Sequence, residues 1–120
     1  MGETAVVSCL RPLYPLAERR AKQGVKDRGD IGGICPQLVI EVKHCPKRFE
    51  ISEWLKEADR EGVNDAALLT CVWFKLRGTT DAMDWPVMMR GRYFVELLKL
   101  WTGNYPTNVG HDENQVSLFQ

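Results

Sequence analysis

Apolar residues recur along this chain with two different periods, one typical of helices and one typical of strands. Helical spacing predicts helices over 2–11 and 51–62, and a last helix whose apolar face is formed by Tyr93, Phe94, Leu97, Leu98 and Trp101. Segments bounded by turn residues predict strands over 15–22, 27–33, 37–43, 67–76 and 85–89. The order αβββαββα predicts an α/β fold of the α+β type, in which helices flank a mixed sheet.

The segment 37–43 combines core and polar residues in one predicted strand. It is rich in β-branched residues and follows a Gly-Gly-Ile-Cys-Pro turn. Because side chains alternate along a strand, Glu41 and Lys43 share one face, roughly 6.6 Å apart at about 3.3 Å per residue. Ile40 and Val42 point to the other face, so one face is predicted to carry polar chemistry and the other to join the core.

Asp30 lies in the strand predicted before this one. If 27–33 is the antiparallel partner of 37–43, Asp30 lies opposite Glu41, with Cβ atoms ~5 Å apart. Such a pair persists only if one carboxylate is protonated or a cation lies between them, and these hard oxygen ligands suit Mg²⁺ or Mn²⁺. Lys43 beside that ion could orient or help deprotonate water and stabilise charge on a phosphate. The pattern predicts a metal-dependent nuclease site; the alternative is an ordinary edge hairpin with charged surface residues.

The run 29–31 followed by 39–43 resembles the PD-(D/E)XK nuclease superfamily, and within it the Holliday junction resolvases. The similarity is to small resolvase-like proteins of actinobacteria and their phages, and it covers about residues 3 to 101. Further segments that carry it are 17–20, 27–31, Trp54, 57–58 and 72–75. The resemblance implies a restriction-endonuclease-like core, αβββαβ, with an added strand and a C-terminal helix.

The resemblance also implies roles for individual residues. Asp30 and Glu41 would ligate the metal together with the main-chain carbonyl of Val42, and Lys43 would be the catalytic base or the water-positioning group. One more acid is implied from the first helix. Glu3 matches by position as a catalytic, metal-ligating residue, although this helix is shorter than the family's, and Glu18 is its rival.

Positive charge gathers around the predicted site although the net charge is zero. Residues 11–48 carry nine Lys or Arg against four Asp or Glu, a local balance of +5. This excess predicts contact with a phosphate backbone, with an affinity that falls as salt rises; a solvated basic face is the alternative. The candidate DNA-binding residues are Arg19, Arg20, Arg28, Lys47 and Arg48. Alternation along a strand turns only one of Arg19 and Arg20 toward the site.

The 120 residues, 44% hydrophobic and 27% charged, predict one nuclease domain over 1–101 and a flexible polar tail over 102–120. No run approaches the ~20 apolar residues of a membrane span, and the start lacks a signal-peptide pattern. We therefore expect a cytoplasmic protein without membrane contact, in the bacterial host cytoplasm if a phage encodes it. The four cysteines lack the spacing of a zinc module and are expected to be reduced thiols.

The end of the chain, 115–120, resembles the bacterial sliding-clamp-binding peptide. Gln115, Leu118 and Phe119 would be its contacts, because two large apolar side chains on a solvated tail are expected to enter a partner groove. The alternatives are that the tail folds back onto the domain or that the short match arose by chance.

Together these patterns predict a Mg²⁺-dependent endonuclease that cuts branched DNA, above all four-way junctions. Paired cuts on a two-fold junction require two active sites, so we expect a symmetric homodimer. A nuclease acting on flaps or single strands is the rival in the same superfamily, because substrate choice depends on loops and oligomer geometry. From a different class, the alternative is a non-catalytic adaptor that binds DNA or the clamp.

Overall fold

The computed structural model describes residues 2–20, 29–35, 37–44 and 47–104. Contacts within the chain divide it into two compact units, Met1–Met89 and Arg90–Gln120, each of which is described by itself. The domain boundary predicted after residue 101 falls inside the second unit. None of the described helices combines the length and the apolar composition that crossing a bilayer requires. The described cysteines, Cys9, Cys35 and Cys71, are free thiols, as their spacing predicts.

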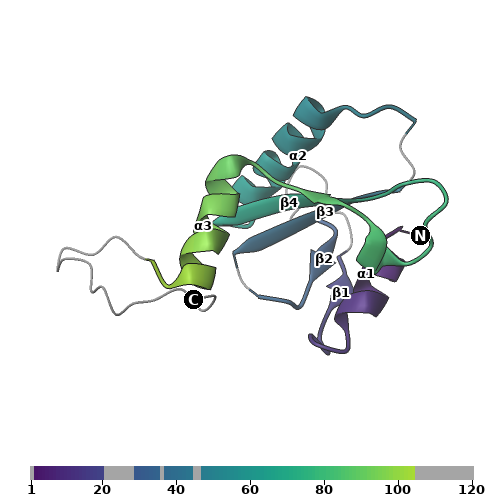
Figure 1. Cartoon of the computed structure of the whole chain (residues 1–120), viewed down its shortest axis with the longest axis horizontal. Coiled ribbons are helices and arrows are strands. Elements are labelled where there is room, and N and C mark those ends of the chain that lie inside the picture. The colour runs from purple at the N-terminus through teal and green to yellow at the C-terminus, as the bar shows by residue number, and fades with distance from the viewer. Residues whose placement is uncertain (1, 21–28, 36, 45–46, 105–120) are drawn as a thin grey trace. The chain divides into compact units, whose positions relative to one another are not determined.

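Helices and strands follow one another in the predicted order over the described residues (Figure 1). The first unit contains α1 (Gly2–Leu10), β1 (Glu18–Arg19), β2 (Ile31–Gly32), β3 (Leu38–His44), α2 (Ile51–Asn64), β4 (Leu69–Lys75), a short 3-10 helix η2 (Ala82–Asp84) and β5 (Val87–Met88). The second unit contains α3 (Gly91–Thr102). The fold is therefore mixed α and β, as predicted. Strands β1, β2 and β5 are shorter than expected, and residues 21–28 between β1 and β2 lie outside the described part.

The larger sheet has the strand order β3-β4-β5. Strand β4 runs parallel to β3, with Glu41 beside Val72 and Lys43 beside Phe74, and antiparallel to β5. Two parallel neighbours need a long crossover, and α2 supplies it between β3 and β4. The sheet is thus of mixed orientation, and its central β-α-β unit places a helix directly over β3.

The predicted antiparallel pairing of 27–33 with 37–43 is wrong as a ladder. Strand β2 pairs with β1, with Arg19 beside Ile31, and the ladder partner of β3 is β4. Asp30 instead contacts β3 through a backbone bond in which its N–H donates to the Ile40 carbonyl at 2.9 Å. Gly29 and Gly33 on either side of β2 have positive φ, and these left-handed residues turn the backbone away from a continuous ladder.

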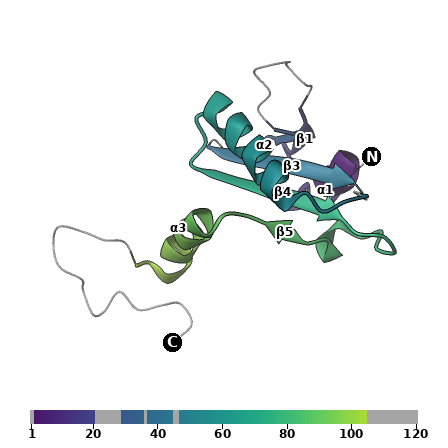
Figure 2. The same cartoon turned by 90° about the horizontal axis from the view of Figure 1, so that it is seen from above.

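The two faces of the larger sheet carry different helices, as Figures 1 and 2 show. On one face, Ile40, Val42 and Cys71 pack into a core cluster with Val6 and Val7 of α1. On the other face, α2 packs through a second cluster. That cluster consists of Trp54, Ala58 and Val72. The alternation predicted for 37–43 is therefore confirmed: Ile40 and Val42 face the α1 core, and Glu41 and Lys43 face α2.

Gly33 lies where the chain comes closest to itself. Its φ is +79°, and a Cβ there would overlap the carbonyl oxygen of Leu16. Gly78 has a similar φ of +86°, but no described atom lies within 4 Å of the position a Cβ would take. Both glycines therefore adopt a left-handed backbone conformation that favours glycine. At Gly33 there is, in addition, no space for a side chain.

We expect Gly78→Ala to lower the free energy of unfolding by about 1 kcal/mol, the cost of a left-handed alanine. Gly33→Ala should lower it by about 3 kcal/mol, because the added methyl group also collides with the Leu16 carbonyl. Urea denaturation of both variants measures the difference. Equal losses in the two variants would contradict the close approach of Leu16 to Gly33.

Candidate active site

Glu41 and Lys43 form the centre of the candidate site on β3. Glu41 is buried, with 5% of its surface exposed, and Lys43 is half-buried. The Lys43 ammonium lies 3.6 Å from Glu41 Oε1 and donates to Glu57 Oε2 of α2 at 2.6 Å. The lysine therefore bridges an acid on its own strand and an acid on the helix above it.

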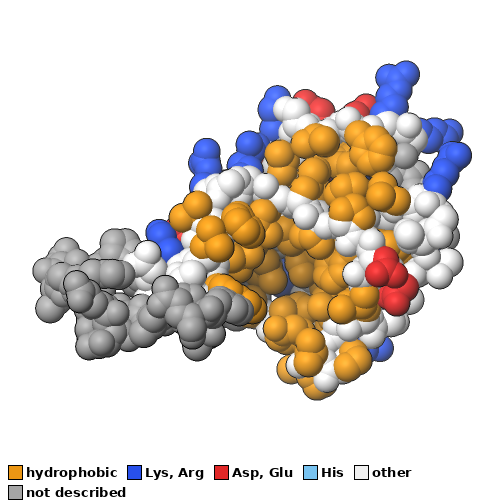
Figure 3. Space-filling model, viewed as in Figure 1, with side chains coloured by type: hydrophobic (Ala, Val, Ile, Leu, Met, Phe, Trp, Pro, Cys, Tyr) orange, Lys and Arg blue, Asp and Glu red, His pale blue; other side chains and the backbone are white. Residues whose placement is uncertain are grey.

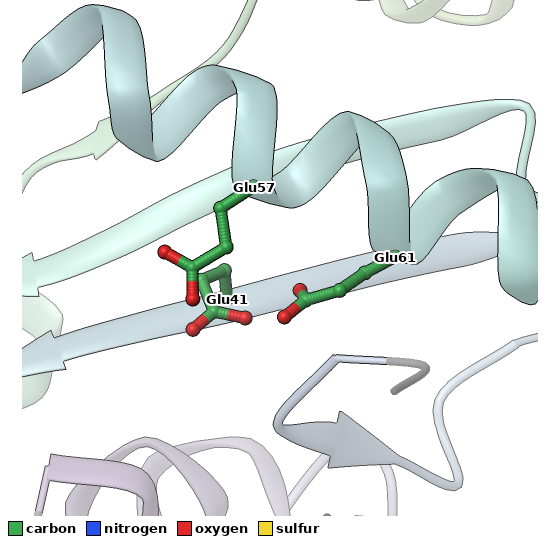
Figure 4. A group of neighbouring side chains, drawn as sticks. All are labelled: Glu41, Glu57 and Glu61. Atoms are coloured by element: carbon green, nitrogen blue, oxygen red, sulfur yellow. The ribbon is translucent and has the colours of Figure 1, made fainter. Parts of the chain in front are cut away.

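Helix α2 adds two further carboxylates, Glu57 and Glu61, to the same place (Figure 4). Four residues apart on a helix, they share one face. One carboxylate oxygen from each of Glu41, Glu57 and Glu61 lies within 4.8 Å of the others. Glu61 is as buried as Glu41, whereas Glu57 is partly exposed. Three acids therefore converge between β3 and α2, a grouping that can hold a metal ion.

Asp30 approaches this group from the free edge of β3. Gly29 makes the approach possible, because its φ is +89° and a Cβ there would lie 2.9 Å from Val39 Cγ1. The buried Asp30 carboxylate accepts a hydrogen bond from the Val42 N–H at 2.7 Å. The N–H and C=O of one strand residue point to the same side, so the Val42 carbonyl is directed to the edge where Asp30 lies.

The acids shift each other's protonation. Burial is the largest cause of a raised pKa at Glu41. A hydrogen bond to the Glu61 carboxyl and the charges of Asp30, Glu61 and Glu57 add to it, and together these causes raise the pKa to about 11. Two carboxyl groups share a hydrogen bond only when one is protonated. Without a cation, Glu41 therefore retains a proton at neutral pH.

The neighbouring acids raise the pKa of Lys43. Burial alone would lower the pKa of Lys43, but its hydrogen bond to Glu57 and the negative charges of Glu57 and Asp30, joined by Glu41 when that acid is ionised, outweigh burial and raise it. The lysine is therefore an ammonium ion in this environment. It can donate hydrogen bonds and stabilise negative charge, and it holds its proton more firmly than a free lysine.

The donor set fits a hard divalent cation. Within the described part of the chain, Glu41 Oε2 is buried and has no hydrogen-bond partner. A buried oxygen of this kind costs free energy unless a proton or a cation satisfies it. Carboxylate oxygens and a main-chain carbonyl are the ligands that Mg²⁺ and Mn²⁺ take. The oxygens that lie close enough together to hold such an ion belong to Glu41, Glu57 and Glu61. Asp30 and the Val42 carbonyl lie at the adjacent edge of β3 and are not members of that group.

Glu3 and Glu18, the two candidates for an additional acid, lie elsewhere among the described residues. Glu3 is half-buried on α1, a helix that packs against the opposite sheet face, and Glu18 is exposed on β1. Neither is a member of the carboxylate group of Glu41, Glu57 and Glu61. The catalytic role of Glu3 therefore stays a prediction from the resemblance.

Glu57 and Glu61 were not predicted as site residues from the sequence. A signal was present, because Glu61 falls at helical spacing from Trp54 and Ala58, on the stripe that α2 buries. An acid within an apolar stripe is rarely buried without a partner of opposite charge or a metal. The predicted site residues came from β3 and from the family resemblance, which includes residues 57–58 but assigns Glu57 no role.

Arg19 and Arg20, two of the predicted DNA-binding residues, contact different parts of the protein. Arg19 donates to Thr4 Oγ1 of α1 at 3.5 Å, whereas Arg20 forms an ion pair with Asp65 at 3.2 Å. Asp65 is the C-cap residue of α2, so Arg20 is the member of the pair that reaches the helix carrying the acids. Lys47 is exposed. Arg28 lies outside the described residues, as do Gln115, Leu118 and Phe119 of the tail.

We expect Glu41→Gln to stabilise the protein in EDTA. The folded-state pKa of Glu41 lies above its unfolded-state value, so the stability this group contributes is full below the unfolded pKa and is lost as pH rises toward the folded pKa. Glutamine carries no such loss. The advantage of the variant in free energy of unfolding should grow from about pH 5 to about pH 9 and reach at least about 1 kcal/mol.

Thermal unfolding across this pH range, with Mg²⁺ or EDTA, measures the effect. Mg²⁺ should raise the unfolding midpoint of the wild type and leave that of Glu41→Gln unchanged, since ligand binding stabilises only a folded state that binds it. Glu53→Gln is the matched control on α2, because the Glu53 side chain is 63% exposed, and it should behave as the wild type. A Glu41→Gln variant that still responds to Mg²⁺ would contradict the role of Glu41 as a ligand.

Comparisons with known proteins leave the family of this chain open. No family model, no curated protein and no solved structure matches it.

Proposed function

We propose that this protein is a metal-dependent endonuclease that hydrolyses phosphodiester bonds in branched DNA, above all in four-way junctions. The observation that carries the proposal is the convergence of Asp30, Glu41 and Lys43 at one end of β3, where a buried carboxylate oxygen lacks a partner within the described chain. Acids that require a cation, beside a lysine that remains charged, form a suitable set for attack on a phosphate.

Asp30, Glu41 and the Val42 carbonyl are the proposed metal ligands, and Glu57 and Glu61 supply further oxygens on the helix side. Bound there, Mg²⁺ would lower the pKa of a water molecule and polarise the phosphate. Binding requires that Glu41 give up its proton, so affinity should rise with pH.

Lys43 has the second role in the proposed mechanism. Its raised pKa supports a function as a cation that positions the attacking water and stabilises charge developing on the phosphate, rather than as a base. The bond of 2.6 Å to Glu57 fixes the ammonium group near Glu41. Glu57 is therefore a positioning residue for the lysine as well as a possible ligand.

The PD-(D/E)XK superfamily, with a restriction-endonuclease-like core in Met1–Met89, is part of the proposal. The motif residues lie on β3, which is joined by α2 to a parallel neighbour and shares its sheet with an antiparallel strand. Helix α1 covers one sheet face and α2 the other. This mixed order of strands and helices supports the superfamily, and the separate β1–β2 ribbon is the feature that fits least directly.

The test is cleavage of a labelled four-way junction beside linear duplex and flap DNA, with Mg²⁺ or EDTA. We expect paired cuts near the junction centre that require Mg²⁺. Lys43→Ala should lower the cleavage rate by at least about 100-fold and retain junction binding, because it removes charge stabilisation at the phosphate. Asp30→Asn should lower cleavage similarly.

Lys56→Ala is the matched control, because Lys56 is an exposed lysine of α2 that pairs with Glu53. It should cleave at the wild-type rate. Full activity of Lys43→Ala would contradict the mechanism. Cleavage of flaps or linear DNA in place of junctions would change the substrate within the nuclease class, and binding without cleavage would favour the adaptor.

A homodimer is also proposed, because paired cuts need two active sites. Helix α3 supports it: the helix is amphipathic and none of its residues is buried. Apolar side chains gather over α3 in Figure 3. Five of them border a hollow with a volume of ≈540 Å³. The residues that line the hollow are Phe94, Leu97, Leu98, Leu100 and Trp101. The sliding clamp remains a proposed second partner, through residues 115–120 outside the described part.

Leu98→Glu should convert the dimer into a monomer, because it places a charge in the apolar face of α3. Light scattering after size exclusion measures the mass. Arg92→Glu is the control, since Arg92 is an exposed polar residue of the same helix, and it should remain dimeric. A monomeric wild type would contradict the proposed dimer, and a dimeric Leu98→Glu variant would contradict the role of α3.

A further inference from the structure

Phe49 is a large aromatic residue that remains exposed beside the candidate site. Its side chain is 60% exposed, although it lies directly before α2. Two other aromatic rings support it from within: the ring centroids of Phe49 and Trp54 are 6.0 Å apart, and those of Phe49 and Phe74 are 6.1 Å apart. The ring centroids of Trp54 and Phe74 are 5.7 Å apart, so the three rings form one aromatic group.

The aromatic group lies on the same sheet face as the acids. Phe74 is the register partner of Lys43 across β3 and β4, so both side chains leave the sheet on the side of α2. Trp54 precedes Glu57 by three residues on α2, and residues at this spacing share a helix face. Phe49 therefore packs against two rings, one of which, Phe74, lies beside Lys43 in the sheet and the other of which, Trp54, lies one turn from Glu57 on α2.

Helix structure accounts for one part of this arrangement. Phe49 precedes the N-cap residue Glu50, and Trp54 is the fourth helical residue, the two positions of a hydrophobic staple. A staple explains the contact between Phe49 and Trp54, and a leucine would serve it as well. It does not explain an aromatic ring of which more than half remains open to solvent.

The residues next to Phe49 indicate what could cover the ring. Lys47 and Arg48 directly precede it, and both are exposed. A supported aromatic ring beside two cations matches the chemistry of single-stranded nucleic acid, in which bases stack on rings and phosphates contact Lys or Arg. An apolar protein partner could pack against the ring but would not form ion pairs with the two cations.

We propose that Phe49 is a stacking platform for a nucleobase whose own stacking is interrupted at a branch point or in a single strand. This inference rests on the proposed function, since the base would belong to the DNA bound at the Asp30, Glu41 and Lys43 site. Lys47 and Arg48 contact the phosphates on either side of that base. A continuous duplex offers no free base face, so Phe49 makes the protein selective for interrupted DNA.

Three substitutions separate stacking from the staple. Phe49→Leu keeps an apolar residue against Trp54 and loses the aromatic face, Phe49→Trp keeps both, and Phe49→Ala loses both. Binding is measured in EDTA, so that it does not depend on cleavage, by the fluorescence of 2-aminopurine placed at the branch of a four-way junction or in a single strand. Linear duplex of the same length is the reference, and thermal unfolding reports the fold of each variant.

We expect Phe49→Leu to bind the junction and the single strand about tenfold more weakly than the wild type, with unchanged duplex binding. Phe49→Trp should bind as the wild type and quench 2-aminopurine as strongly. If Phe49→Leu binds and quenches as the wild type does, stacking is overturned while the nuclease proposal stands. An equal loss on duplex and branched DNA also overturns it, because Phe49 would then act without regard to free bases. If the wild type binds no DNA, both proposals fall.

Discussion

The electrostatic repulsion among buried acids between β3 and α2 is the constraint on which the rest of the site depends. Glu41 loses its hydration when α2 covers β3, and a carboxylate in that position is stable only beside a proton or a cation. Lys43 contributes one positive charge and is fixed by Glu57 at 2.6 Å. One ammonium group does not balance Asp30, Glu41, Glu57 and Glu61 together. Glu41 is therefore satisfied either by the proton that its raised pKa retains or, as proposed, by a divalent cation that replaces this proton.

Packing prevents these acids from moving apart to relieve the repulsion. Trp54 and Ala58 of α2 lie against Val72 at the centre of the sheet. Farther along the helix the contact is closer still, since a Cβ at Gly62 would lie 2.7 Å from Thr70 Cγ2. The side chains that stabilise the β-α-β unit thus hold the carboxylates together. Part of the stability of the apolar core is opposed by the charged site, as is common where binding function requires a destabilised arrangement.

Different contacts fix the two ends of the site. At one end, Gly29 allows the chain to pass close to β3, and the Asp30 carboxylate accepts a bond from Val42 at 2.7 Å. The ion pair of Arg20 with Asp65 joins the β1–β2 ribbon to α2 on the same side. At the other end, the aromatic group carries the exposed ring of Phe49. The three clustered glutamates, Lys43 and the aromatic group therefore lie on the sheet face that α2 covers, and Asp30 lies at the edge of that sheet.

The sequence by itself determined that Glu41 and Lys43 share one face and that apolar residues occupy the other, because side-chain direction along a strand is a local property of the backbone. It also determined the order of helices and strands, since each element has its own period. Only the tertiary structure decided that β3 pairs with β4 while Asp30 reaches it through a backbone bond. It alone buried Glu41 and brought Glu57 and Glu61 to it, and burial, more than these neighbours, raises the pKa of Glu41. Strand partners and burial depend on contacts between distant segments, and the local pattern of hydrophobic and polar residues does not predict those contacts.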